Sequence, residues 1–439
     1  MTRVDPRRAG RLPSRRRRTI SAVTAAWLVC CLAWSANALE LWSEDDSVRR
    51  ADLRSTLKLT GFASHNPEDP WLYPDRTNTT GLLRTRFGVN MVLSDRVTAE
   101  LAYEHHLRRA AHGGGLSFAG NIVSSFGEAP WRLAPLDWQI VRDGETFEYR
   151  HEIDRALVTI QPEWGTITAG RQAIGFGRGV LFSAVDVFAP FSPLEVDREW
   201  RRGVDALRVE YRTSPLSSLE LTAVFGERWE DSAMLARFRG YVGEVDGEII
   251  AGKRGEDAMF AATFSAALGG AAVHGEAALF HTPEEQPDSS VFGKKDLAAK
   301  LVLGSSYTFN VGNGLTVFGE YHYSGFGLSD VEDAVRQIRN EAFIKRYLRG
   351  DSQILGQHAL ALQASYPFSE SLLGSWLMLG SLNDGSGMVI PSLVWSASQS
   401  ATVTLSAFLP WGPSPKNGTL RSEYGSSPFS LFAQLSVYF

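Results

Sequence analysis

The chain has 439 residues and a formal net charge of −5, with 41 glycines, 24 phenylalanines and only two cysteines. The acidic balance and the lack of a basic patch exclude a nucleic-acid-binding protein. No apolar stretch reaches the roughly 18 residues that a membrane-spanning helix needs. Glycines and aromatic residues in this abundance fit an all-β protein of a bacterial envelope.

The first residues, 1–38, predict a secretory signal peptide that is cleaved on export. Eight arginines precede an apolar run at 20–34, and Ser-Ala-Asn-Ala at 35–38 supplies a small-residue cleavage site. Both cysteines, Cys30 and Cys31, lie in this leader. The exported chain can therefore form no disulfide and no thiolate metal site.

Beyond the leader, apolar and polar residues alternate with a period of two, the pattern of strands with one apolar face. In the run that begins at Leu83, Phe87 and Val89 share the apolar face, opposite Arg84 and Arg86. Sixteen strands are predicted in this way, at 55–63, 81–93, 96–105, 154–161, 165–173, 203–213, 218–226, 257–268, 271–281, 295–308, 314–324, 356–366, 371–382, 387–396, 400–409 and 429–439.

The links between these strands alternate in length. Links after even-numbered strands are short, whereas the largest links follow odd-numbered strands, at 106–153, 174–202, 227–256 and 325–355. A soluble sandwich has no reason to sort its loops in this way, but a transmembrane barrel has short periplasmic turns and long outer loops. We predict an all-β, up-and-down antiparallel transmembrane β-barrel of about 16 strands at 55–439, after a short periplasmic segment at 39–54.

If the apolar faces contact lipid, the opposite faces line the lumen. Period two then places these charged side chains inside the barrel: Arg84, Arg86, Glu100, Glu104, Arg208, Glu210 and Arg212, with Glu220, Glu276 and Glu320. Opposed charges across a pore create a transverse field that orders water and screens solutes by charge. The alternative is that the same charges pair along neighbouring strands and only solvate the wall.

The final residues, 431–439, alternate and end in Phe439. This resembles the terminal strand of Gram-negative outer-membrane proteins, which the barrel assembly machinery reads as a signal. Further upstream, Gly-Arg-Gln at 170–172 is followed by Asp-x-Phe-x-Pro at 186–190 and a new strand. That segment resembles porin-like families near the alginate-export porins. Together the resemblances imply a porin-like barrel in the cell outer membrane, with lipid and the assembly machinery as partners.

The link at 174–202 is the third outer loop, and in general porins that loop folds into the barrel and narrows it. Its glycines at 175, 177 and 179 permit a sharp inward bend, and the apolar stretch 180–191 favours burial. The charges that it would bring to a constriction are Asp186, Asp197, Arg198, Arg201 and Arg202. We hypothesise that Asp186 and Arg201 or Arg202 approach opposite sides of the opening. The alternative is a loop packed over the mouth.

Two further loop features have more than one interpretation. Residues 329–349 have helical spacing, with Ser329 or Asp330 as the N-cap, and predict an amphipathic helix that packs in the loop or acts as a lid. Four loop tryptophans could form a sugar-stacking path or could anchor and pack the loops: Trp131, Trp138, Trp200 and Trp229.

No enzyme motif is complete. Residues 247–253 read G-x-x-x-x-G-K, but Arg254 stands where a phosphate-binding loop needs Ser or Thr. His105 and His106 are adjacent, which is not the spacing of a helical zinc protease. We therefore expect no enzymatic activity, no metal and no cofactor.

The predicted function is passive diffusion of small hydrophilic solutes through the barrel. One alternative is a substrate-selective channel or exporter for an anionic saccharide or organic acid. Another is a barrel sheath around a periplasmic electron-transfer partner. Assembly into a homo-oligomer stays open.

Overall fold

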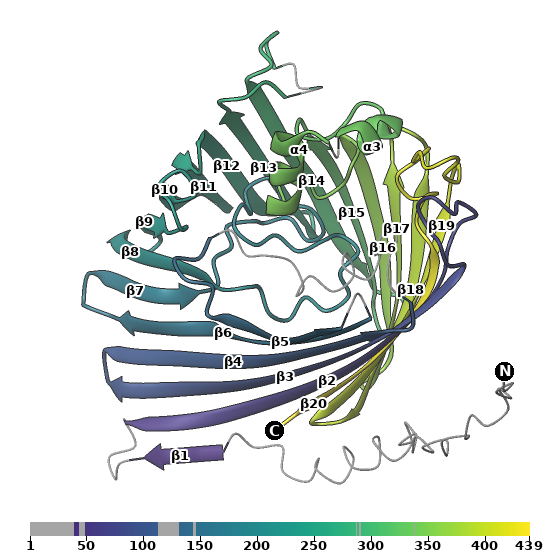
Figure 1. Cartoon of the computed structure of the whole chain (residues 1–439). Coiled ribbons are helices and arrows are strands. Elements are labelled where there is room, and N and C mark those ends of the chain that lie inside the picture. Colours follow the sequence, from purple (N-terminus) through teal and green to yellow (C-terminus); the bar gives the residue numbers. More distant parts are fainter. Residues whose placement is uncertain are drawn as a thin grey trace, which may run out of the picture.

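Alternating side chains organise the chain into one antiparallel sheet that closes on itself. The computed structural model describes residues 39–43, 49–112, 131–143, 146–286, 288, 291–337 and 339–439. The predicted signal peptide at 1–38 lies outside the described residues. Within them, 18 strands form a closed ring, and two more, β1 (Leu39–Ser43) and β5 (Asp137–Asp143), lie outside the ring (Figure 1).

The ring consists, in chain order, of β2 (Arg50–His65), β3 (Thr77–Ser94), β4 (Val97–Ala110), β6 (Phe147–Ile160), β7 (Gly165–Gln172), β8 (Val204–Ser214), β9 (Ser217–Val224), β10 (Ala233–Val242), β11 (Val245–Arg254), β12 (Asp257–Leu268), β13 (Ala271–His281), β14 (Leu297–Phe309), β15 (Leu315–Ser324), β16 (His358–Ser369), β17 (Leu372–Ser381), β18 (Gly387–Ser398), β19 (Ala401–Trp411) and β20 (Phe429–Tyr438).

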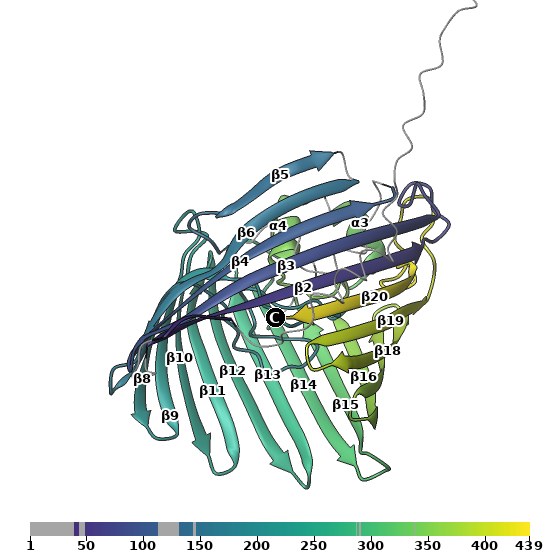
Figure 2. The same cartoon turned by 90° about the horizontal axis from the view of Figure 1, so that it is seen from below.

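The first and last strands of the ring close it. β2 pairs with β20 from Thr56 opposite Tyr438 to His65 opposite Phe429, and Figure 2 shows the two strands side by side. At the end of this pairing, Ser55 and Phe439 exchange two backbone hydrogen bonds, of 2.8 and 3.1 Å. Closure leaves the ring without a free edge, which a sheet in lipid requires.

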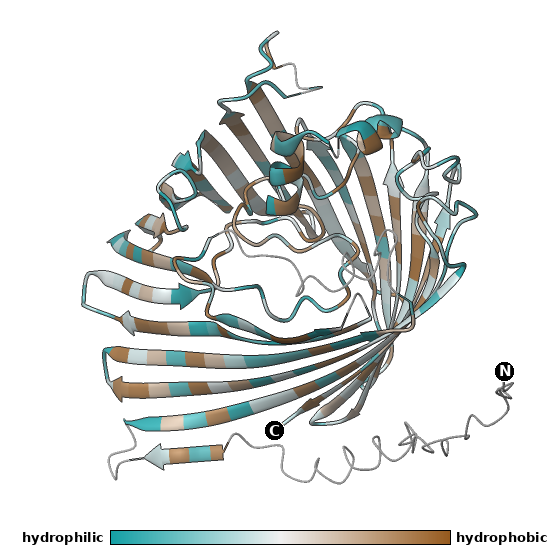
Figure 3. Cartoon of the chain, in the orientation of Figure 1, coloured by the Kyte–Doolittle hydropathy of each residue, from teal (hydrophilic) through white to brown (hydrophobic). Residues whose placement is uncertain are grey.

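The period-two pattern separates an outer apolar face from an inner face. Leu405 is 48% exposed on the outside, whereas the next residue, Ser406, is buried inside. Bands of apolar and polar residues alternate along the strands in Figure 3. In β17, whose register the sequence leaves ambiguous, Trp376 faces outward and Leu379 inward.

The predicted number of strands is wrong by two, because β10 and β11 form a hairpin inside the expected outer loop 227–256. This hairpin lacks a clean alternation, since Leu235 and Ile250 face inward and are nevertheless apolar. Both side chains belong to the hydrophobic cluster of the barrel interior and are not bathed in solvent. The hairpin adds two short turns, at 243–244 and, at the opposite end of the barrel, at 255–256, so the alternation of short and long links is broken before β12.

The two ends of the barrel differ. The turns at 95–96, 161–164, 215–216, 243–244 and 269–270 share what we call the turn end, where β2 begins and β20 stops. The long links 173–203 and 325–357 leave the opposite end, which we call the loop end.

Two strands outside the ring extend it. β1 pairs with the first residues of β2, so the expected segment 39–54 is partly a strand pair. β5 pairs with β6 between Asp143 and Asp137, while β7 pairs only with the other half of β6. β5 thus covers the edge of β6 that is left when the chain after β7 turns inward.

The expected helix at 329–349 is interrupted. It consists of a 3-10 turn η2 (Val331–Asp333), α3 (Ala334–Gln337) and α4 (Glu341–Arg349). The side chain of Asn340 accepts hydrogen bonds from the N–H groups of Ala342 and Phe343 and so starts a new helix. No helix in the described part of the chain is long and apolar enough to cross a membrane.

Candidate functional site in the barrel interior

The loop between β7 and β8, residues 173–203, lies inside the ring of strands (Figure 1). Its first half is apolar, and Ile174, Phe176, Phe182 and Phe188 are each at most 3% exposed. These side chains join one hydrophobic cluster with residues of the barrel wall. Removing this apolar surface from water favours the inward position of the loop.

Two carboxylates of the wall hold this half of the loop through its backbone. Glu320 of β15 accepts hydrogen bonds of 2.7–3.0 Å from the N–H groups of residues 180–182. Glu276 of β13 accepts from the N–H groups of residues 178, 179, 184 and 185 and from Ser183 Oγ. The two side chains therefore satisfy seven backbone donors, which would otherwise be costly to bury.

The second half of the loop returns to the wall formed by β2 and β3. Lys58 Nζ lies 2.7 Å from Asp197 Oδ1 and 2.6 Å from Glu199 Oε2. The ring of Trp200 lies 4.1 Å from Lys58 Nζ and 4.9 and 5.0 Å from the guanidinium carbons of Arg84 and Arg86. Ion pairs and cation–π contacts thus fasten this limb. The loop consequently crosses the interior between two parts of the wall.

Asp186 and Arg201 are in direct contact, with Arg201 Nη1 donating to Asp186 Oδ2. The hypothesis that these two residues lie on opposite sides of an opening is therefore wrong. Burial raises the pKa of Asp186, and the neighbouring Arg201 opposes that rise. Because Arg201 also donates to the carbonyl oxygen of Ala189 at 2.7 Å, the pair joins the two halves of the loop.

Arg198 also has a structural role within the loop. It donates to the carbonyl oxygens of Val180, Ser192, Pro193 and Glu195 at 2.8–3.1 Å. Burial lowers the pKa of this guanidinium group. Arg198 thus uses its donors to hold the backbone of the loop.

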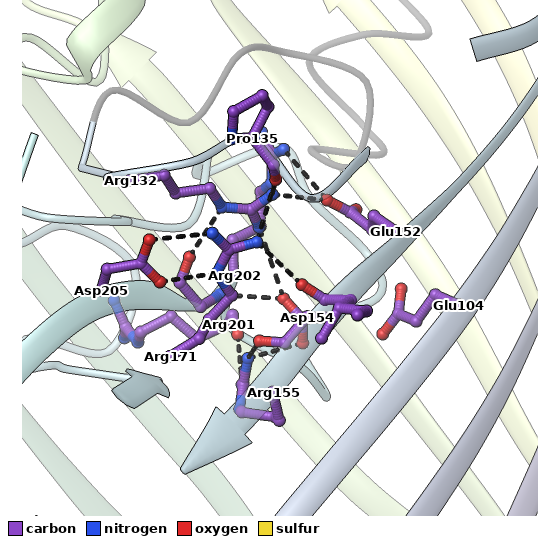
Figure 4. A network of polar contacts seen from close by, with 12 residues as sticks. Glu104, Arg132, Pro135, Glu152, Asp154, Arg155, Arg171, Arg201, Arg202 and Asp205 are labelled. Atoms are coloured by element: carbon purple, nitrogen blue, oxygen red, sulfur yellow. Dashed lines mark hydrogen bonds and ion pairs between the residues drawn. The ribbon is translucent and has the colours of Figure 1, made fainter. Parts of the chain in front are cut away.

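An ion-pair cluster lies beside the loop, on β3, β4 and β6, and Figure 4 labels two of its carboxylates, Glu104 and Asp154. Arg84 donates to the two oxygens of Glu104 at 2.9 and 3.0 Å. Arg86 contacts Glu104 and lies 2.7 Å from Asp154 Oδ2. Glu100 is more distant, 4.0 Å from Arg86. These charges lie on the inner face, as expected, and pair between neighbouring strands.

The predicted charges of β8 lie apart from the loop. Arg208 Nη2 pairs with Glu220 Oε2 at 2.6 Å. Glu210 is half-buried and Arg212 is exposed, close to the turn end. The structure therefore does not bring these residues together with Asp186 and Arg201.

Three arginines surround Glu152 of β6. Its carboxylate oxygens lie 2.7 Å from Arg132 Nη1 and 3.7 Å from both Arg150 Nη2 and Arg202 Nη2. Burial lowers the pKa of Arg202 to about 10 even though Glu152 opposes the shift, and Arg132 and Arg150 contribute to the lowering. Three guanidinium groups thus meet beside Glu152 where the loop returns into β8, and Arg132 Nη2 also lies 3.8 Å from Asp154 Oδ1.

Glu104, His106 and Glu152 form the one group, in the part of the chain that the structure describes, whose ligand atoms all lie within 4.8 Å of one another, as a metal would need. The sheet register places Glu104 directly opposite Glu152. Both carboxylates already accept hydrogen bonds from arginines. A divalent cation would have to displace those arginines and enter a positively charged region, so the surroundings oppose metal binding.

The Gly-Arg-Gln segment has a structural function. Arg171 donates to the two carboxylate oxygens of Asp205 at 2.7 and 2.9 Å and to the carbonyl oxygens of Pro135 and Ile153 at 2.9 and 3.0 Å (Figure 4). Arg171 is therefore buried between β7, β8 and the segment before β5, where it fixes the start of the inward loop.

The tryptophans do not form a shared path. Trp131 is buried and packs edge-on against Phe188, with ring centroids 5.3 Å apart. Trp138 stacks on His151 at 5.1 Å, and Trp229 is 60% exposed. Only Trp200 reaches the ion-pair cluster.

Sequence reasoning missed several residues of this interior, above all Lys58, Arg132, Glu152 and Asp154. Lys58 had a usable signal, because it occupies an inward position two residues from Thr56 and from Thr60. Arg132 and Glu152 gave none, since they lie in the expected outer loop 106–153, whereas Asp154 is the first residue of the strand expected at 154–161.

Comparisons with known proteins agree on the fold. No family model matches the chain, and no curated relative matches it by sequence. The structure is similar to Acinetobacter baumannii OccAB2, with a TM-score of 0.53 and 7% identity over 89% of this chain and 98% of that chain. At this identity the likeness shows a shared barrel fold alone.

Two other solved barrels are less similar. Pseudomonas aeruginosa OccD3 (OpdP) has a TM-score of 0.48 and 9% identity, covering 92% of this chain and 94% of that chain. Salmonella typhi OmpF, in complex with daunomycin, has a TM-score of 0.45 and 12% identity, covering 91% and 100%. The comparisons do not show the alginate-export resemblance.

Proposed function

We propose that this protein is an outer-membrane channel through which small hydrophilic solutes diffuse passively. The observation that carries the proposal is a closed ring of 18 strands with an apolar outside and a charged inside. Barrels of 16–18 strands are wide enough to leave an aqueous lumen. No enzymatic step is part of the proposal.

The cellular location belongs to the same proposal. A cleaved signal peptide at 1–38 would direct export, and the terminal Phe439 would be read by the barrel assembly machinery. The turn end would face the periplasm and the loop end the outside, as in other outer-membrane barrels.

In this proposal residues 174–202 form the constriction. Support comes from the loop's fixed position across the interior, held by Glu276 and Glu320 on one side and by Lys58 on the other. A loop in this position disfavours the sheath alternative, because a threaded periplasmic partner would have to displace it.

A second candidate function is selective passage of anions such as an organic acid or an anionic saccharide. One observation favours it: the guanidinium groups of Arg132, Arg150 and Arg202 gather around Glu152 in the interior. Positive side chains that gather in a passage with low-dielectric walls raise the local concentration of anions.

Single-channel recording in a planar bilayer tests both candidates. The purified barrel should show stepwise conductance, and deletion of residues 180–195 should increase it because the loop no longer fills the interior. Asp186→Asn should shift the reversal potential in a salt gradient in the direction of greater anion selectivity, because the guanidinium group of Arg201 loses its carboxylate partner. A barrel that conducts no ions, or a deletion that conducts like the parent, would contradict the proposal.

A further inference from the structure

A concave groove of about 1630 Å³ crosses the outer face of the sheet. It extends from the loop end of β4 and β6, at Arg109 and Phe147, to the turn end of β15 and β16, at Leu315 and Phe368. Most side chains that line it are apolar and point away from the barrel interior. The groove therefore belongs to the face that would contact lipid.

The floor of the groove follows one row of paired residues across the sheet. Arg109 is opposite Gly81, Gly81 opposite Gly61, and Gly61 opposite Ala433. The row then continues through Leu405 to the remaining strands. A row of paired residues crosses neighbouring strands at about 4.8 Å per strand. The three residues that follow Arg109 in this row, Gly81, Gly61 and Ala433, are small, so the groove is deep beside Arg109.

The packing of the chain does not require glycine at position 61 or at position 81. A Cβ atom added to Gly61 or to Gly81 would meet no atom within 4 Å. The same addition at Gly374, further along the row, would meet the ring of Phe368 at 2.5 Å. Glycine weakens a strand interior and often marks the close approach of a ligand. Gly61 and Gly81 thus leave open a space that the protein does not fill.

The groove has charge at one end only. Arg109 is the single charged residue among those that line it. Arg109 is exposed, and no ion pair or hydrogen bond of its guanidinium group is found among the described residues. An apolar trough with one cation at its end is complementary to an amphiphile with an anionic head. A second copy of this chain is a poorer occupant, since a symmetric contact would set one concave face against another.

We infer that the groove binds one phosphorylated membrane lipid, with its phosphate at Arg109 and an acyl chain along Gly81, Gly61 and Ala433. A guanidinium group matches a phosphate with two parallel hydrogen bonds. In the orientation proposed above, Arg109 lies at the level of the outer leaflet, so the occupant is a lipid of that leaflet. The inference rests on the proposed membrane location but not on conduction.

Native mass spectrometry of the detergent-purified full chain tests the inference. The probes are a bisphosphorylated, multiply acylated glycolipid and a zwitterionic phosphatidylcholine of similar size. The parent should retain one glycolipid and prefer it to phosphatidylcholine. Gly81→Phe, which fills the floor, should reduce retention of both lipids, and Gly61→Ile serves as a second variant in case the first fails to assemble. Arg109→Gln should reduce glycolipid retention about tenfold, because it removes a charge-assisted hydrogen bond.

Two matched controls separate the groove from the rest of the wall. Ala262→Phe adds the same ring on the outer face of β12, and Arg142→Gln removes an exposed arginine outside the groove. Both should retain lipid like the parent. Equal retention by Gly81→Phe and Ala262→Phe, or dimers with no bound lipid, would overturn the inference. If such a barrel still conducted ions, the channel proposal would stand.

Discussion

Replacing Glu320 by alanine would remove the acceptor of the N–H groups of residues 180–182, at 2.7–3.0 Å in the parent. Leaving a buried donor without an acceptor costs about 1–3 kcal/mol. Three such donors weaken the docked loop by about 3 kcal/mol or more, which corresponds to roughly a hundredfold larger undocked population. Glu320→Gln keeps one acceptor oxygen and, of the three loop N–H groups, leaves only that of Val180 without an acceptor, so its effect should be roughly tenfold.

The undocked population can be measured by cysteine labelling. Both native cysteines lie in the predicted leader, so Ala184→Cys would place a single thiol in the buried loop, where Ala184 is 0% exposed. The rate of maleimide labelling reports how often the loop opens. It should rise from the parent to Glu320→Gln and again to Glu320→Ala.

The control is Glu210→Ala, which removes a glutamate from the inner face of β8, away from the loop. It should leave the labelling rate unchanged. Equal rates in the parent and in Glu320→Ala would show that the carboxylate does not hold the loop, and the argument for a fixed constriction would fail.

Four further predictions follow from individual residues. Leu405→Arg on the outer face should cost roughly 2–4 kcal/mol in lipid refolding titrations, whereas Thr404→Arg on the inner face should be tolerated; equal costs would refute the register. Burial raises the pKa of Glu423 from its ordinary value of 4.5 to about 7. The protonated carboxyl group therefore contributes fully to the free energy of unfolding below pH 4.5, and this contribution is lost as the pH rises through 7. Thermal unfolding should show this loss in the parent but not in Glu423→Gln. Lys58→Met removes the ion-pair partner of Asp197 and Glu199, so the reversal potential should shift in the direction of greater cation selectivity. An unchanged reversal potential would place these two carboxylates outside the conducting path. Deletion of Phe439 should lower the yield of heat-modifiable, assembled barrel in outer-membrane fractions.

The sequence by itself determined the class of fold and the two faces of the wall. Period-two alternation depends only on neighbouring residues, and it correctly places Leu405 outside and Glu104 inside. The long links 173–203 and 325–357 likewise leave the same end of the barrel, as an up-and-down topology requires. The inward direction of the link at 174–202 was predictable from its apolar stretch, because a long apolar segment has to be buried somewhere.

Tertiary structure alone decided the partners inside the barrel. Lys58 meets Asp197 across 139 positions of the chain, and Glu320 meets Phe182 across 138. No periodicity relates residues so far apart, since only closure of the ring brings these walls to face one loop. The hairpin β10–β11 was missed for the same reason. Leu235 and Ile250 face inward but are apolar, because they belong to the hydrophobic cluster that includes the inward loop. The folded loop also brings Asp186 into contact with Arg201. The sequence placed both residues in one loop but could not show that they form an ion pair.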